Sequence, residues 1–246
     1  MPDAVPDADL HLYFDPVCPF CWLTSKWVRT VAARRRYTVD WRFISLRLVN
    51  AHVDYAARFP PEYETGHTAG LRLLRVAART RAEHGRDAVG RLYAALGAEI
   101  FDSDPVPDEA VAPAARGTRP FVAPVLAAAG LPSDLADALD DASFDAVVQA
   151  ETDEALALTG RDVGTPILHF EPPGGVAFFG PVISRLPAAD EAEELWEHVV
   201  GLARFPGFAE LKRSLRELPQ LRALGVADGE TGVVQEWEAG SRRVHR

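Results

Sequence analysis

The two cysteines of this 246-residue chain, Cys18 and Cys21, stand three positions apart in the stretch FDPVCPFCW. A thiol at the start of a helix faces the positive end of the helix dipole and unpaired backbone N–H groups, which favour its thiolate form. Cys18 precedes Pro19, a residue type suited to the first helical turn. Cys21 would lie about one turn further on, where its sulfur can reach that of Cys18. The spacing therefore predicts a redox pair in which Cys18 attacks and Cys21 resolves the mixed disulfide.

Two other roles for the cysteines fit the sequence less well. A zinc site normally needs four ligands, and the chain has no second cysteine pair and no HExxH motif, so no metal is expected. Inert structural thiols remain an alternative, but they would have no reason to flank the start of a helix. The redox role is favoured.

The residues around the cysteines predict a βαβ unit. Residues 10–15, LHLYFD, are mainly apolar and are followed by Pro16, as expected for a short buried strand. Apolar residues then recur at helical spacing from Trp22 to the basic run 34–36, where cations offset the dipole of a helix that ends. Residues 39–46, VDWRFISL, alternate apolar and polar side chains, which indicates a second strand.

The middle of the chain, about residues 60–160, is alanine-rich and is predicted to be helical. Gly85 and Gly160 would end two of its helices, and Ser143 would cap the second of these. Further helical segments are expected from the following positions: Ala88 to Ile100, and from near Phe121 and near Ser133, with a proline-punctuated stretch at 105–120.

After Gly160 the pattern changes to strands. VGTPILHF and VAFFG flank the turn sequence Pro172-Pro173-Gly174-Gly175, so together they predict a hairpin. A helix is expected over residues 188–204. The order βαβ, helical block, ββα predicts one α/β domain with a large all-helical insertion.

The expected boundaries follow from this order: residues 1–55 and 161–219 for the two parts of the α/β unit, 56–160 for the insertion, and 220–246 for a poorly patterned tail that is a candidate for partial disorder.

The composition excludes some partners. The formal net charge of −10 argues against nucleic acid or an anionic membrane surface, which both require a basic face. No apolar stretch reaches the roughly 18 residues of a membrane span. The acidic first residues lack the apolar core of a signal peptide. A cytoplasmic protein is expected, and there thiols are kept reduced.

Four stretches resemble DsbA-like thioredoxin-fold oxidoreductases with a helical insertion, and more narrowly the mycothiol-dependent nitroreductase group. They are, in order: FDPVCPFCW, GTPILHF, AFFGPVISRLP and LWEHVVGLARFPGFAELKR. The resemblance covers most of the chain to about Pro219, although the insertion matches only loosely. Pro19-Phe20 stands where Pro-Trp is common, which should tune the redox potential and the pocket shape without changing the class of reaction.

The resemblance implies a thioredoxin-like fold and an enzyme with no bound cofactor. It would take electrons from a low-molecular-weight thiol, mycothiol, and pass them to a disulfide or an aromatic nitro compound, as a monomer or homodimer. A cytosolic protein disulfide oxidase or isomerase, and a redox sensor without turnover, are the alternatives. Related glutathione-dependent isomerases usually have serine at the position of Cys18, so the two cysteines argue against that activity.

In such proteins a cis-proline begins the strand that faces the cysteine pair, which assigns this place to Pro166 after Thr165. The expected catalytic residues are Cys18, Cys21 and Pro166. The residues expected to bind substrate are Pro19, Phe20, Trp22, Thr165 and Phe179.

Other polar residues have weaker claims on the site. Asp15 could accept a proton near Cys21, but a turn aspartate before Pro16 is as good an interpretation. Asn50, Tyr63 and His67 lie where the insertion begins and could reach the cleft, although each such residue type is more often on the surface or in the core.

Overall fold

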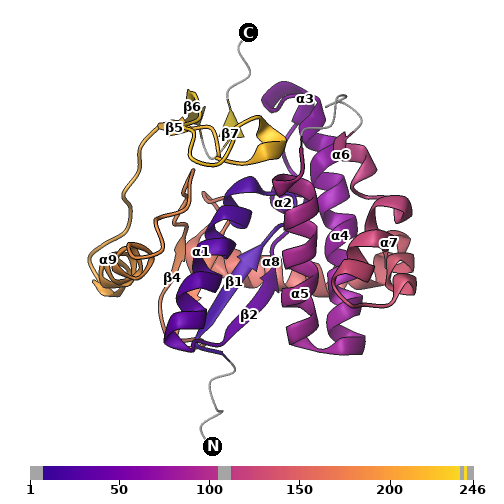
Figure 1. The fold of residues 1–246 in the computed structure, drawn as a ribbon, viewed down its shortest axis with the longest axis horizontal. Coiled ribbons are helices and arrows are strands. Elements are labelled where there is room, and N and C mark those ends of the chain that lie inside the picture. Colours follow the sequence, from indigo (N-terminus) through magenta and orange to yellow (C-terminus); the bar gives the residue numbers. More distant parts are fainter. Residues whose placement is uncertain (1–7, 105–111, 239–240, 243–246) are drawn as a thin grey trace, which may run out of the picture.

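A four-stranded mixed sheet in the order β2-β1-β3-β4 organises the fold (Figure 1). The structure, a computed structural model, describes residues 8–104, 112–238 and 241–242. Strand β1 (Leu10–Phe14) pairs in parallel with β2 (Val39–Phe43). On its other side β1 pairs antiparallel with β3 (Ile167–Phe170), which pairs antiparallel with β4 (Ala177–Phe179). The predicted mixed α/β fold and the hairpin are confirmed.

Strand β1 is buried on both faces because all five of its residues are apolar or have an apolar ring body. Leu12 and Phe14 belong to the main core together with α1 (Pro19–Arg35). Tyr13 faces the other way, into a smaller cluster with Ala155 of α8 (Asp145–Thr159). Helices therefore cover both faces of the sheet, and the end of β1 delivers the chain into the start of α1.

Helix α1 ends where the basic run predicts. Arg36 takes a left-handed conformation with φ 58°, and its N–H donates to the carbonyl of Ala32. Arg35 pairs with Glu193 at 3.5 Å, in the first turn of α9 (Ala192–Arg204). Trp27 packs edge-on against Trp196, with ring centres 5.3 Å apart. Helix α9 thus lies beside α1 on the same face of the sheet.

Strand β2 is shorter than the sequence predicts. It ends at Phe43 rather than at Leu46 because the Ser45 hydroxyl accepts a hydrogen bond from the N–H of Leu48 and caps the short helix α2 (Leu46–Val49). Helix α9 also begins later than predicted, at Ala192 rather than at 188.

The middle of the chain is helical, as predicted. Its elements are α3 (Tyr55–Arg58), α4 (Glu62–His84), α5 (Arg86–Gly97), a π-helical turn (Ala98–Asp102), α6 (Ala112–Ala115), α7 (Arg119–Ala128), two 3-10 segments (Ser133–Asp140 and Ala142–Phe144) and α8. Gly85 and Gly160 end α4 and α8, as expected. Part of the proline-punctuated stretch, 105–111, lies outside the described residues.

The prediction that Ser143 caps α8 is wrong. Ser143 lies within a 3-10 turn, and its backbone N–H donates to the Asp141 carboxylate at 2.9 Å. Because the Asp141 carboxylate accepts a hydrogen bond from the backbone two residues further on, it separates the 3-10 segment that ends at Asp140 from the one that begins at Ala142. Helix α8 then starts after Phe144 without a side-chain cap.

The tail, which has no clear sequence pattern, contains secondary structure in the part that the structure describes. Residues 215–242 contain β5 (Leu215–Glu217), β6 (Val234–Glu238) and β7 (Ser241–Arg242), which form a small sheet, and a 3-10 turn (Arg222–Leu224). The N–H of Gln220 donates to the carbonyl of Ser184 at 2.7 Å, and Arg185 pairs with Glu217 at 3.2 Å. The C-terminal segment, as residues 215–238 are called below, thereby covers the start of α1 (Figure 1).

Helix α5 approaches α1 closely at a glycine. A Cβ atom added at Gly97 would lie 2.1 Å from Cε3 of Trp22. The indole of Trp22 is held there by a hydrogen bond to Asp102 at 3.0 Å.

No helix among the described residues is long and apolar enough to cross a membrane.

The Gly97→Ala variant should lose about 1–3 kcal/mol of unfolding free energy, because the added methyl group overpacks a fixed indole. Gly201 in α9 has no atom within 4 Å of an added Cβ. Gly201→Ala should therefore gain about 0.5–1 kcal/mol from helix propensity. Urea unfolding of both variants tests the difference, and equal effects would show that Gly97 is not a contact point.

Candidate active site

Cys18 is the N-cap residue of α1, where the chain turns from β1 into the helix. Its backbone is extended, with φ −87° and ψ 116°, and Pro19 occupies the first helical turn. The backbone N–H of Cys21 donates to the Cys18 sulfur at 3.4 Å. The sulfur thus accepts one of the backbone donors that the helix start leaves unpaired.

The two thiols are free and differ in environment. Cys18 is 6% exposed and Cys21 is completely buried. Burial opposes ionisation of Cys18, but hydrogen bonds from Cys21 and from the Thr165 side chain outweigh it, so the pKa of Cys18 lies below its ordinary value. Burial, together with the neighbouring Cys18, raises the pKa of Cys21 well above its ordinary value. The asymmetry predicted from the sequence is therefore present in the structure.

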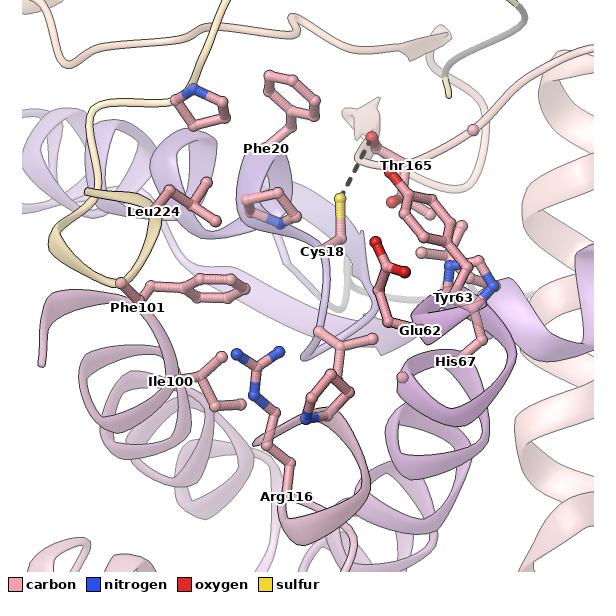
Figure 2. A pocket seen from close by; sticks show the side chains of 18 of the residues that line it. Cys18, Phe20, Glu62, Tyr63, His67, Ile100, Phe101, Arg116, Thr165 and Leu224 are labelled. Carbon is pink, nitrogen blue, oxygen red and sulfur yellow. Dashed lines mark hydrogen bonds between the residues drawn. The ribbon is translucent and has the colours of Figure 1, made fainter. Parts of the chain in front are cut away.

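Thr165 contacts Cys18 from the segment that precedes β3. The Thr165–Pro166 peptide bond is cis, as expected. The Cys18 thiol donates to the Thr165 carbonyl oxygen at 3.8 Å (Figure 2). The Thr165 hydroxyl is buried and has no hydrogen-bond partner among the described residues. It can donate to the thiolate when Cys18 ionises.

Asp15 lies buried behind the cysteines, at the end of β1. Its carboxyl group accepts hydrogen bonds from the N–H of Val17 at 3.0 Å and of Leu46 at 2.7 Å. Burial raises the pKa of Asp15 to about 7, against the lowering effect of these two donors. The negative charge of Asp15 also works against the Cys18 thiolate. Asp15 is thus both a turn residue and a titratable neighbour of the pair.

A pocket of about 800 Å³ opens over Cys18. Its walls come from the start of α1, the helical block, the segment before β3, and the C-terminal segment. The lining residues outside the C-terminal segment, including Asn50 after α2 and Phe179 of β4, are Pro19, Phe20, Asn50, Phe59, Tyr63, His67, Ile100, Phe101, Arg116, Thr165 and Phe179, among others. The C-terminal segment adds Arg216, Leu218, Pro219, Ala223, Leu224 and Gln235. In Figure 2 the labelled side chains surround the Cys18 sulfur.

Most residues expected to bind substrate line the pocket, and one does not. Pro19, Phe20, Thr165 and Phe179 line it together with Cys18. Trp22 does not: it packs edge-on against Tyr93 in the core, because its N–H is paired with Asp102.

The place of Phe20 between the two cysteines favours an exposed ring, but the residue is 5% exposed, and the guanidinium carbon of Arg216 lies 5.8 Å from its ring centre. Cys21 and Pro166 are buried and do not line the pocket themselves. Asn50, Tyr63 and His67, the weaker candidates, all line it.

An aromatic cluster forms the wall at the start of α4. Phe59 stacks on Tyr63 with ring centres 5.4 Å apart. The hydroxyl of Tyr55 and Nδ1 of His67 are 3.0 Å apart, within hydrogen-bond distance. Burial lowers the pKa of His67 to about 4. The imidazole is therefore neutral at neutral pH, and the wall offers flat rings rather than a charge.

Sequence reasoning missed the walls supplied by Phe101, Arg116 and the C-terminal segment. Phe101 and Arg116 belong to no sequence motif, and the tail has no hydrophobic periodicity, so the sequence gives no reason to place them beside Cys18. Gly117 after Arg116 was the one local signal of a close approach. Among the described residues no three His, Cys, Asp or Glu side chains are grouped as metal ligands would be.

The sequence as a whole matches a family model. Residues 17–213 match the Rv2466c-like family, described as mycothiol-dependent nitroreductase Rv2466c. This covers the cysteine pair, the helical block and strands β2, β3 and β4, so the chain belongs to this family.

A curated relative extends the comparison. The uncharacterized protein Rv2286c of Mycobacterium tuberculosis (strain ATCC 25618 / H37Rv) is 34% identical over 206 residues, which span 83% of this chain and 81% of that protein.

Cys18 should react with iodoacetamide at low pH. In a Cys21→Ser variant the serine hydroxyl keeps a donor beside Cys18, so the alkylation profile should have its midpoint below the ordinary thiol value of about 8.5. Adding Thr165→Val should move the midpoint to higher pH, because the hydroxyl that stabilises the thiolate is lost. Rates measured across pH by mass spectrometry test this, and an unchanged midpoint in the double variant would exclude the role of Thr165.

Asp15→Asn should change how stability depends on pH. The folded-state pKa of Asp15, about 7, lies above its ordinary 3.8. Between these two pH values the folded protein keeps Asp15 protonated, whereas the unfolded chain has already lost this proton. The contribution of Asp15 to the unfolding free energy is therefore fully present below about pH 4 and is lost as the pH rises to about 7. Relative to the variant, the wild type should lose about 4 kcal/mol over this range. Urea unfolding of both reduced proteins at several pH values measures the difference, and parallel curves would contradict it.

Proposed function

We propose that this protein is a thiol-disulfide oxidoreductase that uses mycothiol to reduce disulfides or nitroaromatic compounds. The observation that carries the proposal is the position of Cys18, a thiol of lowered pKa that caps a helix and faces a pocket large enough for a small molecule. Cys21 lies directly behind it. Membership of the mycothiol-dependent nitroreductase family supports the choice of reductant.

With a disulfide as acceptor, the reaction balances as two exchanges. The Cys18 thiolate attacks one sulfur, the S–S bond breaks, and one thiolate leaves with the electron pair. Cys21 then loses its proton to solvent and attacks the Cys18 sulfur, which releases the second thiolate and leaves a Cys18–Cys21 disulfide. Two molecules of mycothiol restore the dithiol and leave as mycothiol disulfide.

The burial of Cys21 decides where the reductant attacks. Cys18, with the lower pKa, is the better leaving group, which alone would favour attack on Cys21. Cys21, however, is completely buried, whereas Cys18 lines the pocket. The first mycothiol therefore forms its mixed disulfide with Cys18 and releases Cys21 as a thiol. A second mycothiol then attacks the mycothiol sulfur of this mixed disulfide, which releases the Cys18 thiolate and mycothiol disulfide. The sequence contains no GxGxxG fingerprint, so a small thiol rather than a nucleotide is proposed as the electron donor.

We also propose a more specific class for the fold, and the basis is the order and direction of the strands in the central sheet. The strand order β2-β1-β3-β4, with a parallel first pair and an antiparallel hairpin, supports a thioredoxin-like fold of the DsbA type. Residues 56–160 would be the insertion in that fold. A cytoplasmic location is part of the proposal, because the cysteines need a reducing compartment.

The enclosure of Cys18 favours small substrates over proteins. Only 6% of Cys18 is exposed, and the pocket above it is closed by the helical block and the C-terminal segment. A protein disulfide would have to displace these walls. This geometry supports the small-molecule reductase over the disulfide oxidase or isomerase.

The Cys21→Ser variant should accumulate a stable adduct on Cys18, because the resolving thiol is absent. The adduct should form with mycothiol disulfide faster than with glutathione disulfide, whose polar groups differ. Intact-mass spectrometry after incubation with each disulfide measures both rates, with Cys18→Ser as the control that forms none. Equal rates would remove the preference for mycothiol, and the absence of any adduct would favour a sensor without turnover.

A further inference from the structure

Arg116 brings a partly buried cation into the pocket without an anionic partner among the described residues. The side chain points into the space beside Cys18 (Figure 2). Its guanidinium carbon lies 6.0 Å from the centre of the Phe101 ring, at the outer limit of a cation–π contact. Burial lowers the pKa of Arg116. A buried cation without a counter-ion is unfavourable, and a bound anion would relieve this.

Other partly buried arginines of the protein have partners. Arg75 pairs with Asp145 at 2.6 Å, and Arg81 pairs with Glu151 at 2.7 Å. Arg29 has no carboxylate, but it donates to the carbonyl of Gly90 at 2.8 Å and lies 4.0 Å over the ring of Trp41. These contacts explain why the three charged side chains are stable although they are partly buried. They do not explain Arg116.

The backbone around Arg116 is fixed by close packing on α4. A Cβ atom at Gly117 would lie 3.1 Å from the Cα of Ala69, so the turn fits tightly against the helix. The hydroxyl of Thr118 donates to the carbonyl of Ala115 at 2.7 Å and closes the turn. Arg116 is thus held in place before any ligand binds, which lowers the entropy lost on binding.

We propose that Arg116 binds the carboxylate of an aromatic acceptor, so that the substrates are aromatic acids with a reducible disulfide or nitro group. The planar guanidinium matches a carboxylate with two parallel hydrogen bonds. Phe20, Phe101 and Tyr63 give the same pocket aromatic walls. The assignment rests on the proposed function, since it names the substrate class of the same thiol pair.

The remaining charges of the pocket make Arg116 necessary for an anion. The other charged residues that line it are Arg58, Arg216, Glu62, Glu99 and Asp104. Without Arg116 these carboxylates outnumber the arginines, and an acidic substrate would be repelled. With Arg116 the signs balance, and the arginine that points beside Cys18 can bind the acid.

Two aromatic disulfides test the assignment on the reduced protein. One is the dianionic 5,5′-dithiobis(2-nitrobenzoate), and the other is the neutral 4,4′-dithiodipyridine. Arg116→Gln should slow the reaction of Cys18 with the dianion roughly 10- to 100-fold, the effect of losing a hydrogen bond to a charged group, and leave the neutral disulfide unchanged. Arg116→Lys should restore part of the rate. Stopped-flow absorbance of the released thiolate measures each rate.

Arg119→Gln is the matched control, because it removes the same charge from an exposed arginine that pairs with Asp137. It should leave both rates unchanged. Equal slowing of both disulfides by Arg116→Gln, or no slowing of either, would overturn the assignment. Circular dichroism checks that each variant is folded, and Arg116→Lys tests the charge if the glutamine variant is not.

A binding measurement separates this assignment from the proposed chemistry. In a Cys18→Ser variant, which cannot react, 4-nitrobenzoate should bind more tightly than the neutral 4-nitrobenzamide, and Arg116→Gln should abolish the difference. Calorimetry reads both affinities. Equal affinities would overturn the role of Arg116, whereas a clear preference in a protein whose thiols reduce neither disulfide would overturn the reductase and keep the carboxylate site.

Discussion

The hydrogen bond from the Cys21 N–H to the Cys18 sulfur is the constraint on which the site depends. It exists because β1, buried on both faces, brings the chain to the first turn of α1 at Cys18. It places one sulfur at the surface of the pocket and the other in the core. Asp15 ties the same turn to the start of α2 through Leu46. The pKa of Cys18 is therefore a balance between burial, which opposes ionisation, and the hydrogen bonds from Cys21 and Thr165, which favour the thiolate, while the Asp15 carboxylate adds a smaller opposing effect.

The sequence was sufficient for features that depend on neighbours along the chain. The cysteine pair at a helix start, the hairpin after Thr165 and the glycine-terminated helices α4 and α8 are of this kind. Where two local signals competed, prediction failed. Asp141 rather than Ser143 is the side-chain acceptor of this turn and binds the N–H of Ser143, and Ser45 caps α2 and ends β2 early. The thioredoxin-like assignment itself came from resemblance rather than from the residues alone.

The pocket could be predicted only on the side that the motif forms. Phe101, Arg116 and Arg216 come from segments far apart in the sequence, and only tertiary packing brings them to Cys18. The error over Trp22 has the same origin, because Asp102 lies in the helical block and holds the indole in the core. Periodicity reports which face of an element is apolar. It does not report which distant element covers that face.

The C-terminal segment contributes Arg216, Leu218 and Leu224 to the pocket, although the family model ends at residue 213. It joins the rest of the protein through the bond between Gln220 and Ser184 and through Leu221, which is buried in the main core, but its strands do not pair with the central sheet. The side chains of this segment that face the pocket are therefore separate from the strand and helix that hold the two thiols. A change in those side chains alone would reshape the space above Cys18 and leave the cysteine pair in place.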